Sequence, residues 1–108
     1  MGSMQLPLEH SEALGQGLLD IGRAAKASGV SVKMVRHYEA IGLLGPVART
    51  YANYRVYSDN NVHTLRFIKR ARALGFSVDE CRHLLEDVQN LHQQVVVALT
   101  NEIDSLAA

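Results

Sequence analysis

The stretch from residue 29 to residue 57 constrains the fold more than any other part of the chain. Ser31 is a good helix N-cap, because its hydroxyl can accept a hydrogen bond from a free amide two or three residues later. Gly42 fits the left-handed position at a helix end, and Pro46 excludes further helix. Together these signals predict a short helix over residues 31–41.

The two faces of this predicted helix differ in chemistry. Its inward positions are apolar: Val32, Val35 and Ile41. Leu43, beyond the helix end, joins them. Its outward positions carry basic or imidazole side chains: Lys33, Arg36 and His37. Such a helix packs on a core with one face and presents cations on the other.

A further helix is predicted immediately before it, from Leu19 to Ser28. Asp20 can cap this helix, and small alanines in it would let a second helix approach closely. Gly29 then separates the two helices. Helix, glycine turn and basic second helix form a helix-turn-helix pattern.

Residues 45–57 combine turn residues with alternating extended positions, which predicts a small hairpin. Asn53 tolerates the positive φ that a tight turn needs. Beside a helix-turn-helix, such a hairpin is a wing that carries basic and aromatic side chains: Arg49, Tyr51, Tyr54, Arg55 and Tyr57. In the alternative interpretation the tyrosines pack in the core, and we expect at least one to be mainly structural. The arginines would then form a solvated edge that blocks strand aggregation.

Two more helices follow the hairpin. Ser58 can cap a helix that runs to Leu74 and stops at Gly75, with apolar side chains expected on its inner side. Ser77 and Glu80 have the spacing of a capping box for the next helix. The corner between these helices is basic on one side and carries Arg72.

From residue 88 onward the sequence contains neither Gly nor Pro. Its apolar residues fall at positions 88, 91, 95, 99, 103 and 106, which form one helical stripe. A helix this apolar must pack on its own domain or on a partner chain. If it packs on a partner chain, residues 88–108 form a short dimerisation helix with the interface Leu91, Val95, Leu99, Ile103 and Leu106. Whether a break near residues 89–94 separates it from the preceding helix stays open.

Net charge is zero over the 108 residues, but the charge is unevenly distributed. Between residues 21 and 75, ten basic residues face two acidic ones, a net charge of +8. The first twenty residues carry −3 and the residues from 76 onward carry −5. A basic block of this size suggests an anionic partner, although a solvated basic surface would have the same composition.

Length and composition limit the remaining classes. A chain of 108 residues holds one domain, and its one cysteine fits a reducing compartment. We expect a cytoplasmic, nucleoid-associated protein, because neither a membrane span nor a secretory signal is recognisable. Residues 1–18 are expected to form a flexible arm whose first three residues look like a cloning remnant. Residues 19–87 are expected to form the winged helix-turn-helix domain.

Several kinds of chemistry lack a motif. The sequence has no nucleophile elbow, phosphate loop or paired carboxylates, so we expect no enzyme activity and no cofactor. The five histidines are scattered, and neither Cys-x-x-Cys nor His-x-x-x-His spacing occurs, so no metal site is expected. Core packing is the favoured role for Cys81, with a thiol sensor as the alternative.

Double-stranded DNA fits the basic segment best. A short helix with exposed cations suits the major groove, and arginine and tyrosine side chains suit the phosphates beside it. The candidate DNA-binding residues are Lys33, Arg36, His37, Tyr38, Arg49, Tyr54, Arg55, Tyr57 and Arg72.

Residues 19–85 resemble the N-terminal DNA-binding region of the MerR family of transcription regulators. The resemblance rests on Asp20-Ile-Gly-Arg-Ala-Ala, Gly29-Val-Ser-Val-Lys-Met-Val-Arg-His-Tyr-Glu, Ile41-Gly-Leu-Leu, Asn53-Tyr-Arg-Val-Tyr-Ser and Leu65-Arg-Phe-Ile-Lys-Arg-Ala-Arg-Ala-Leu-Gly-Phe-Ser. The copper- and heavy-metal-responsive branch is the most similar.

This resemblance implies a mainly α winged helix-turn-helix with a second helical wing and an antiparallel coiled coil. Such homodimers bind a pseudo-palindromic promoter element and distort it so that RNA polymerase can engage. By position, Lys33, Arg36 and Tyr38 would lie on the recognition helix.

The chain departs from the family pattern at two places. Ala52-Asn53 stands where the family has Asn-Gly, so the wing turn is expected to differ. An ungapped comparison places Val95 beside the position of a family metal ligand, and the cysteine-bearing loop is missing, so metal sensing is not expected.

Two other functions stay open at this stage. The apolar helix could pair with a longer relative or recruit another protein, which would make the chain an interaction module. Cys81 could serve a thiol- or metal-sensing function.

Overall fold

The computed structural model describes residues 17–107. In chain order, its elements are α2 (Ile21–Ser28), α3 (Val32–Ala40), β1 (Ala48–Arg49), β2 (Arg55–Val56), α4 (Asp59–Ala73) and α5 (Val78–Ala107). The predicted fold class, mainly helical with one small hairpin, is confirmed. Of the arm expected over residues 1–18, residues 1–16 lie outside the described part of the chain.

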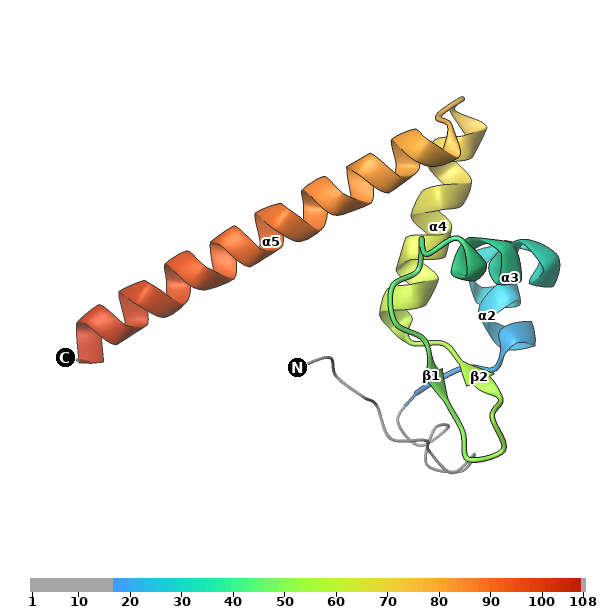
Figure 1. Cartoon of the computed structure of the whole chain (residues 1–108), viewed down its shortest axis with the longest axis horizontal. Coiled ribbons are helices and arrows are strands. Elements are labelled where there is room, and N and C mark those ends of the chain that lie inside the picture. The colour runs from blue at the N-terminus through green and yellow to red at the C-terminus, as the bar shows by residue number, and fades with distance from the viewer. Residues whose placement is uncertain (1–16, 108) are drawn as a thin grey trace.

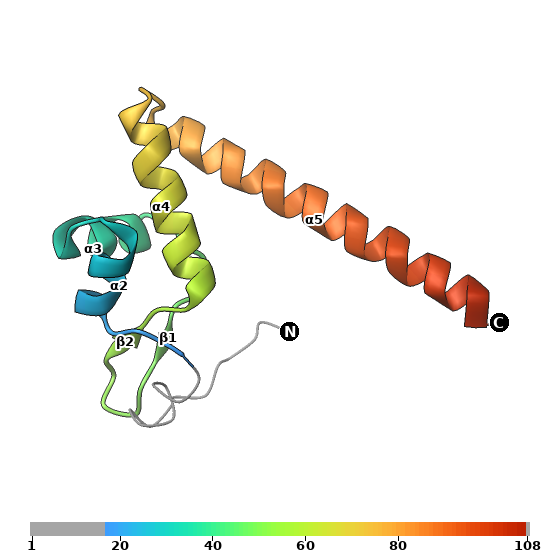
Figure 2. The ribbon, with the colours of Figure 1, turned by 180° about the vertical axis from the view of Figure 1, so that it is seen from behind.

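The molecule consists of a head and a long extension (Figure 1). The head contains α2, α3, α4 and the hairpin, and α5 leads away from it, as the opposite view in Figure 2 also shows. The radius of gyration is 16.3 Å, against the ~13 Å of a compact domain of this length. None of the described helices is long and apolar enough to cross a lipid bilayer.

Side chains predicted to start helices do so. Asp20, Ser31 and Ser58 each accept a hydrogen bond from a backbone amide three residues later. The first helix starts at Ile21 rather than at Leu19, because Leu19 instead exchanges two backbone hydrogen bonds with Tyr57. This bridge ties the chain before α2 to the end of the hairpin.

The end of α3 explains why glycine stands at position 42. Gly42 has φ +80°, and its amide donates to the Glu39 carbonyl while the Leu43 amide donates to the Tyr38 carbonyl. This pair of bonds is a Schellman motif, which needs a left-handed residue after the last helical one. The predicted left-handed conformation is therefore confirmed, and Ile41 is the C-cap itself.

The hairpin is antiparallel and short. Ala48 lies opposite Val56, and Arg49 lies opposite Arg55. Its turn is closed by the Asn53 amide, which donates to the Thr50 carbonyl, and Asn53 has φ +68°. Asparagine thus takes the left-handed position that ends a three-residue hairpin loop.

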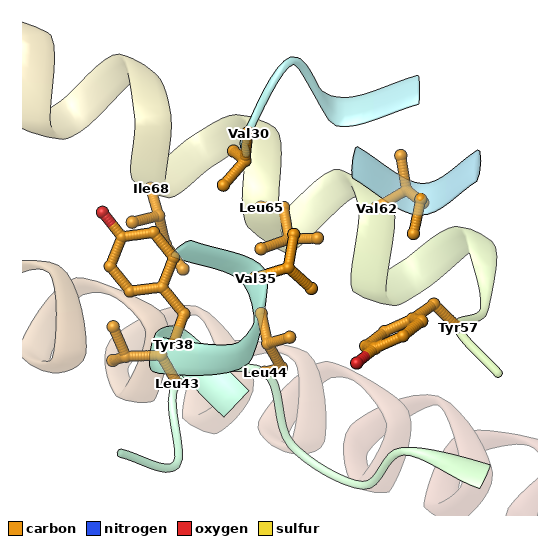
Figure 3. Close-up of a cluster of buried hydrophobic side chains, with 10 residues drawn as sticks. Val30, Val35, Tyr38, Leu43, Leu44, Tyr57, Val62, Leu65 and Ile68 are labelled. Carbon is orange, nitrogen blue, oxygen red and sulfur yellow. The ribbon is translucent and has the colours of Figure 1, made fainter. Parts of the chain in front are cut away.

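The core lies between α2, α3 and α4, with residues from the loop after α3 (Figure 3). Val35, Leu65 and Ile68 have no exposed surface. The buried side chain of Asn61 joins the start of α4 to that loop, because it donates to the Leu44 carbonyl and accepts from the Ser58 amide. Leu74 was expected inside, but it lies at the helix end and is 79% exposed.

The C-terminal helix differs most from expectation. No break occurs near residue 88, and α5 is one helix of 30 residues that follows the Ser77–Glu80 capping box. Nothing in residues 88–94 ends a helix, which answers the open question of a break near residues 89–94. The division into a domain over residues 19–87 and a dimerisation helix over residues 88–108 stays a prediction. At 1.5 Å per residue, α5 is about 45 Å long.

Candidate nucleic-acid interface

The outer face of α3 carries three exposed side chains, here called the reading stripe: Lys33, Arg36 and His37. They lie three and four residues apart, which places them on one side of a helix. Val35 and Tyr38 face the core on the other side. The predicted two-faced helix is therefore confirmed, and its cations are accessible to a partner.

Tyr38 does not belong to the outer face. Only 6% of the residue is exposed, and its ring lies among the core side chains of Figure 3. A tyrosine in this position contributes mainly to packing. Its hydroxyl is not enclosed, because no buried side-chain oxygen in the described residues lacks a hydrogen-bond partner, so a phosphate contact through it stays a prediction.

The hairpin places two of its candidate residues at the surface. Tyr54 is 70% exposed, and Arg55 is exposed in the second strand. Arg49 is half-buried, and its Nη1 donates to Oδ1 of Asn53 over 3.2 Å, which stiffens the hairpin tip. The hairpin therefore presents a guanidinium and a phenol next to a closed turn.

The reading stripe and the hairpin meet at one cleft of about 350 Å³. Arg36 enters it from α3, Tyr54 and Arg55 from the hairpin, and Asp20 and Ile21 from the start of α2. Residues 18 positions apart in sequence thus share one surface, as the wing interpretation predicts for Arg36 and Tyr54.

Glu39 connects the same two elements from below the surface. Its Oε2 accepts from Nε of Arg55 over 2.7 Å, and its Oε1 accepts from the hydroxyl of Tyr57 over 2.7 Å. The hydrogen bond and charge of Glu39 raise the pKa of Arg55. Sequence reasoning missed this role, although alternation along the strand places Arg55 and Tyr57 on one face.

Tyr57 was a candidate phosphate contact, and the structure places it elsewhere. The residue has no exposed surface, and its hydroxyl is occupied by Glu39. Burial, followed by the hydrogen bond to Glu39, raises the pKa of Tyr57 far above its ordinary value. The expectation that at least one hairpin tyrosine is structural is confirmed by Tyr57, which leaves the candidate interface.

The cations of α4 lie apart from this cleft. Arg72 is exposed at the corner before α5, where its Nη1 donates to the Phe76 carbonyl over 3.0 Å. Arg66 donates through Nε and Nη2 to the Ala27 carbonyl, at the C-terminal end of α2. Part of the +8 charge therefore stabilises the fold, since cations are favourable at helix C-termini.

Metal and thiol chemistry find no further support in residues 17–107. No three His, Cys, Asp or Glu side chains in this part of the chain lie close enough together to hold a metal ion. Cys81 is fully buried at the start of α5, so the prediction that it packs in the interior is confirmed. A buried thiol in apolar surroundings is a poor candidate for a reactive sensor.

Comparisons with known proteins identify the family. The pattern of MerR HTH family regulatory proteins matches residues 19–88. Heavy metal-dependent transcription regulator 2 of Rhizobium meliloti (strain 1021) is 60% identical over 67 residues, which cover 62% of this chain and 46% of that protein. The chain thus spans about half the length of this curated relative.

Two solved structures share the fold. PbrR691 from Ralstonia metallidurans CH34, solved in complex with lead(II), is 31% identical with a TM-score of 0.59 over 83% of this chain and 78% of that one. HiNmlR, a MerR family regulator lacking the sensor domain and bound to promoter DNA, is 20% identical with a TM-score of 0.62 over 82% and 75%. All three of these proteins are described as regulators, which agrees with the lack of an enzymatic motif in the sequence. The chain belongs to the MerR family of helix-turn-helix transcriptional regulators.

Proposed function

We propose that a homodimer of this protein binds a pseudo-palindromic promoter element in double-stranded DNA with sequence specificity. The observation that carries the proposal is the shared cleft of Arg36, Tyr54 and Arg55, which joins the exposed face of α3 to the hairpin. A solved relative of the same fold, HiNmlR, is bound to promoter DNA, which supports this choice of partner.

The reading stripe supplies the contacts that would distinguish sequences. A helix with exposed side chains on one face fits the major groove, where Arg36 can donate two hydrogen bonds to guanine. Lys33 and His37 flank it and can reach bases or phosphates. The hairpin supplies Tyr54 and Arg55, and Arg49 at its base, for the backbone beside the groove.

Arg72 would contact DNA from a second point. It lies at the α4–α5 corner, and only Nη1 of its guanidinium is engaged by the Phe76 carbonyl in the described part of the chain. Its other donors are available for a phosphate. Two separated phosphate contacts would fix the orientation of the head on the duplex.

The apolar stripe of α5 supports a second copy of this chain as the partner. Its six members, Val88, Leu91, Val95, Leu99, Ile103 and Leu106, are all exposed. Their spacings are the same read in either direction, so they are symmetric about position 97. Two antiparallel copies with a two-fold axis there bring every stripe residue level with another, Val95 of one copy with Leu99 of the other.

The charges on α5 favour the same arrangement. Beyond the head, the helix carries Glu86, Asp87, Glu102 and Asp104. In a parallel pair each carboxylate would lie level with the same carboxylate of the other copy. In the antiparallel pair none of them lies level with another acid. Glu102, for example, would lie level with His92. Like charges side by side are unfavourable, so the antiparallel pair is the better one.

As a regulator of transcription, the dimer would act at the nucleoid, in the cytoplasm, and RNA polymerase at the same promoter would be its second partner. The exposed stripe also supports one other function, which is pairing with a longer relative to form mixed dimers. Light scattering of the pure protein and of a mixture with such a relative separates the two.

The DNA proposal is tested by selecting bound duplexes from a randomised pool and sequencing them. We expect a spaced inverted repeat, with affinity that falls steeply with salt because several phosphates are neutralised. Arg36→Ala should cost ~1–3 kcal/mol of discrimination at one base pair in each half-site. Arg82→Ala, on α5, makes the same change of charge at a residue that does not line the cleft and serves as the control. Enrichment of no sequence would refute the proposal, and unchanged preference in Arg36→Ala would remove Arg36 from base reading.

A further inference from the structure

We propose that Glu39 is a positioning residue of the DNA-binding face, which holds the Arg55 guanidinium so that its terminal nitrogens are presented to a phosphate beside Arg36. This inference rests on the proposed function and adds a residue that makes no contact with DNA itself. Its basis is a pair of hydrogen bonds between α3 and the hairpin.

Both oxygens of the Glu39 carboxylate are used by the second half of the hairpin. One accepts from Nε of Arg55 and the other from the hydroxyl of Tyr57, each over 2.7 Å. Arg55 and Tyr57 stand two residues apart in an extended segment, so both reach the same side of the chain. The carboxylate therefore fixes where this segment lies against α3.

The geometry leaves the useful part of Arg55 available. A guanidinium has five N–H donors, and in residues 17–107 only Nε of Arg55 has a partner. The four donors on the terminal nitrogens can bind phosphate in the bidentate manner that arginine favours. The Glu39 side chain is 16% exposed and that of Arg55 is 44% exposed, so the pair is anchored inside and open outside.

This arrangement orders Arg55 before DNA arrives. Arginine loses much side-chain freedom when it is fixed in an interface, which reduces affinity. Because Glu39 already restrains Arg55 in the free protein, less freedom remains to be lost on binding. Arg36, Glu39, Ala40 and Arg55 line a second hollow, so the restrained guanidinium of Arg55 lies beside Arg36.

Charge alone predicts the opposite effect of Glu39. A carboxylate near a polyanion repels it, so removal of the carboxylate should tighten DNA binding. Positioning instead predicts that removal loosens Arg55 and weakens binding. Two variants that lose the same negative charge therefore separate the two roles. Charge alone predicts equal affinity for DNA, whereas positioning predicts weaker binding by the variant that no longer holds Arg55.

Glu39→Gln and Glu39→Ala form the matched pair, because both remove the same negative charge. Glutamine can still accept the Nε hydrogen bond of Arg55 through its amide oxygen, and alanine cannot. Both changes are made in the Tyr57→Phe background, since alanine alone would leave the buried Tyr57 hydroxyl without a partner. Circular dichroism and thermal melting show that each variant is folded.

Binding to a selected duplex is measured by fluorescence anisotropy over a series of salt concentrations. We expect the alanine variant to bind about tenfold more weakly than the glutamine variant, which is about 1.4 kcal/mol. Its plot of log Kobs against log salt should be shallower by ~1.8, because the homodimer loses one phosphate contact in each of its two copies. Adding Arg55→Ala should weaken the glutamine variant and leave the alanine variant almost unchanged.

Equal binding by the two variants would overturn the inference, and tighter binding by the alanine variant would do so as well. Arg36→Ala in the same background distinguishes this failure from failure of the proposed function. If Arg36→Ala weakens binding and the Glu39 variants do not differ, only the role of Glu39 is refuted. If the parent protein shows neither sequence preference nor salt dependence, the DNA-binding function itself fails.

Discussion

Val95 and Val97 offer a sharp test of the proposed dimer face of α5. They are the same residue type, two positions apart in the middle of α5, and they are 48% and 51% exposed. Two residues along an α-helix differ in direction by about 200°, so the two side chains lie on nearly opposite faces. Only Val95 belongs to the apolar stripe.

The expected cost of Val95→Ala follows from the exposed surface that a partner can cover. The change removes two methyl groups, each worth ~0.8 kcal/mol when fully transferred from water. Because Val95 is already about half covered in the single chain, association gains about half of that, or ~0.8 kcal/mol per copy. A dimer contains two copies, so its dissociation constant should rise by about 15-fold, or ~1.6 kcal/mol.

Val97→Ala is the control, and its dissociation constant should change less than about twofold. The gain in helix propensity is the same for both variants and cancels in the comparison. Sedimentation velocity over a concentration series gives both constants. An equal effect of the two substitutions, or an effect of Val97→Ala alone, would refute the proposed face.

Three further predictions concern the head. Leu65→Ala should lower the free energy of unfolding by ~2–5 kcal/mol in urea titrations, since Leu65 has no exposed surface, whereas Leu74→Ala, at an exposed position, should change it by less than ~0.5 kcal/mol. Ser58→Ala should cost ~1 kcal/mol in the same assay, because it removes the cap and half of the box with Asn61; no loss would show that water replaces the cap. The pKa of Tyr57 is higher in the folded than in the unfolded protein, so its stabilising contribution is present below about pH 10 and is lost as pH rises further. Between pH 8 and pH 11, the free energy of unfolding should therefore fall more in the parent protein than in Tyr57→Phe. Equal decreases in the two proteins would contradict the assignment.

Local chemistry explains what could be predicted from the sequence. Ser31 and Ser58 cap helices because their partners lie three residues away, and Asn53 takes a positive φ because its own side chain permits it. The two faces of α3 follow in the same way from helical spacing. Such signals are contained in windows of a few residues, so no knowledge of the tertiary structure is needed.

Contacts between distant segments explain what could not be predicted. The bonds of Glu39 reach 16 and 18 residues along the chain. In the sequence Glu39 is merely one of two acids in a basic block. Tyr54 and Tyr57 look equivalent as hairpin tyrosines, yet the bridge to Leu19 and the bond to Glu39 bury only Tyr57. The alternation of the strand gives the face of a side chain, but it does not say which face is covered.

The continuity of α5 links the proposed DNA contacts to the proposed dimer. The helix begins at the capping box beside Arg72 and contains the whole apolar stripe, with no interruption between them. The heads of an antiparallel pair would therefore be separated by two rigid helices rather than by flexible linkers. Each head would contact one half-site, so the spacing of the proposed inverted repeat would be a property of α5. A break near residues 89–94, which the sequence left open, would have uncoupled the two. In the proposed dimer the uninterrupted helix would make dimer register and operator spacing one geometric quantity.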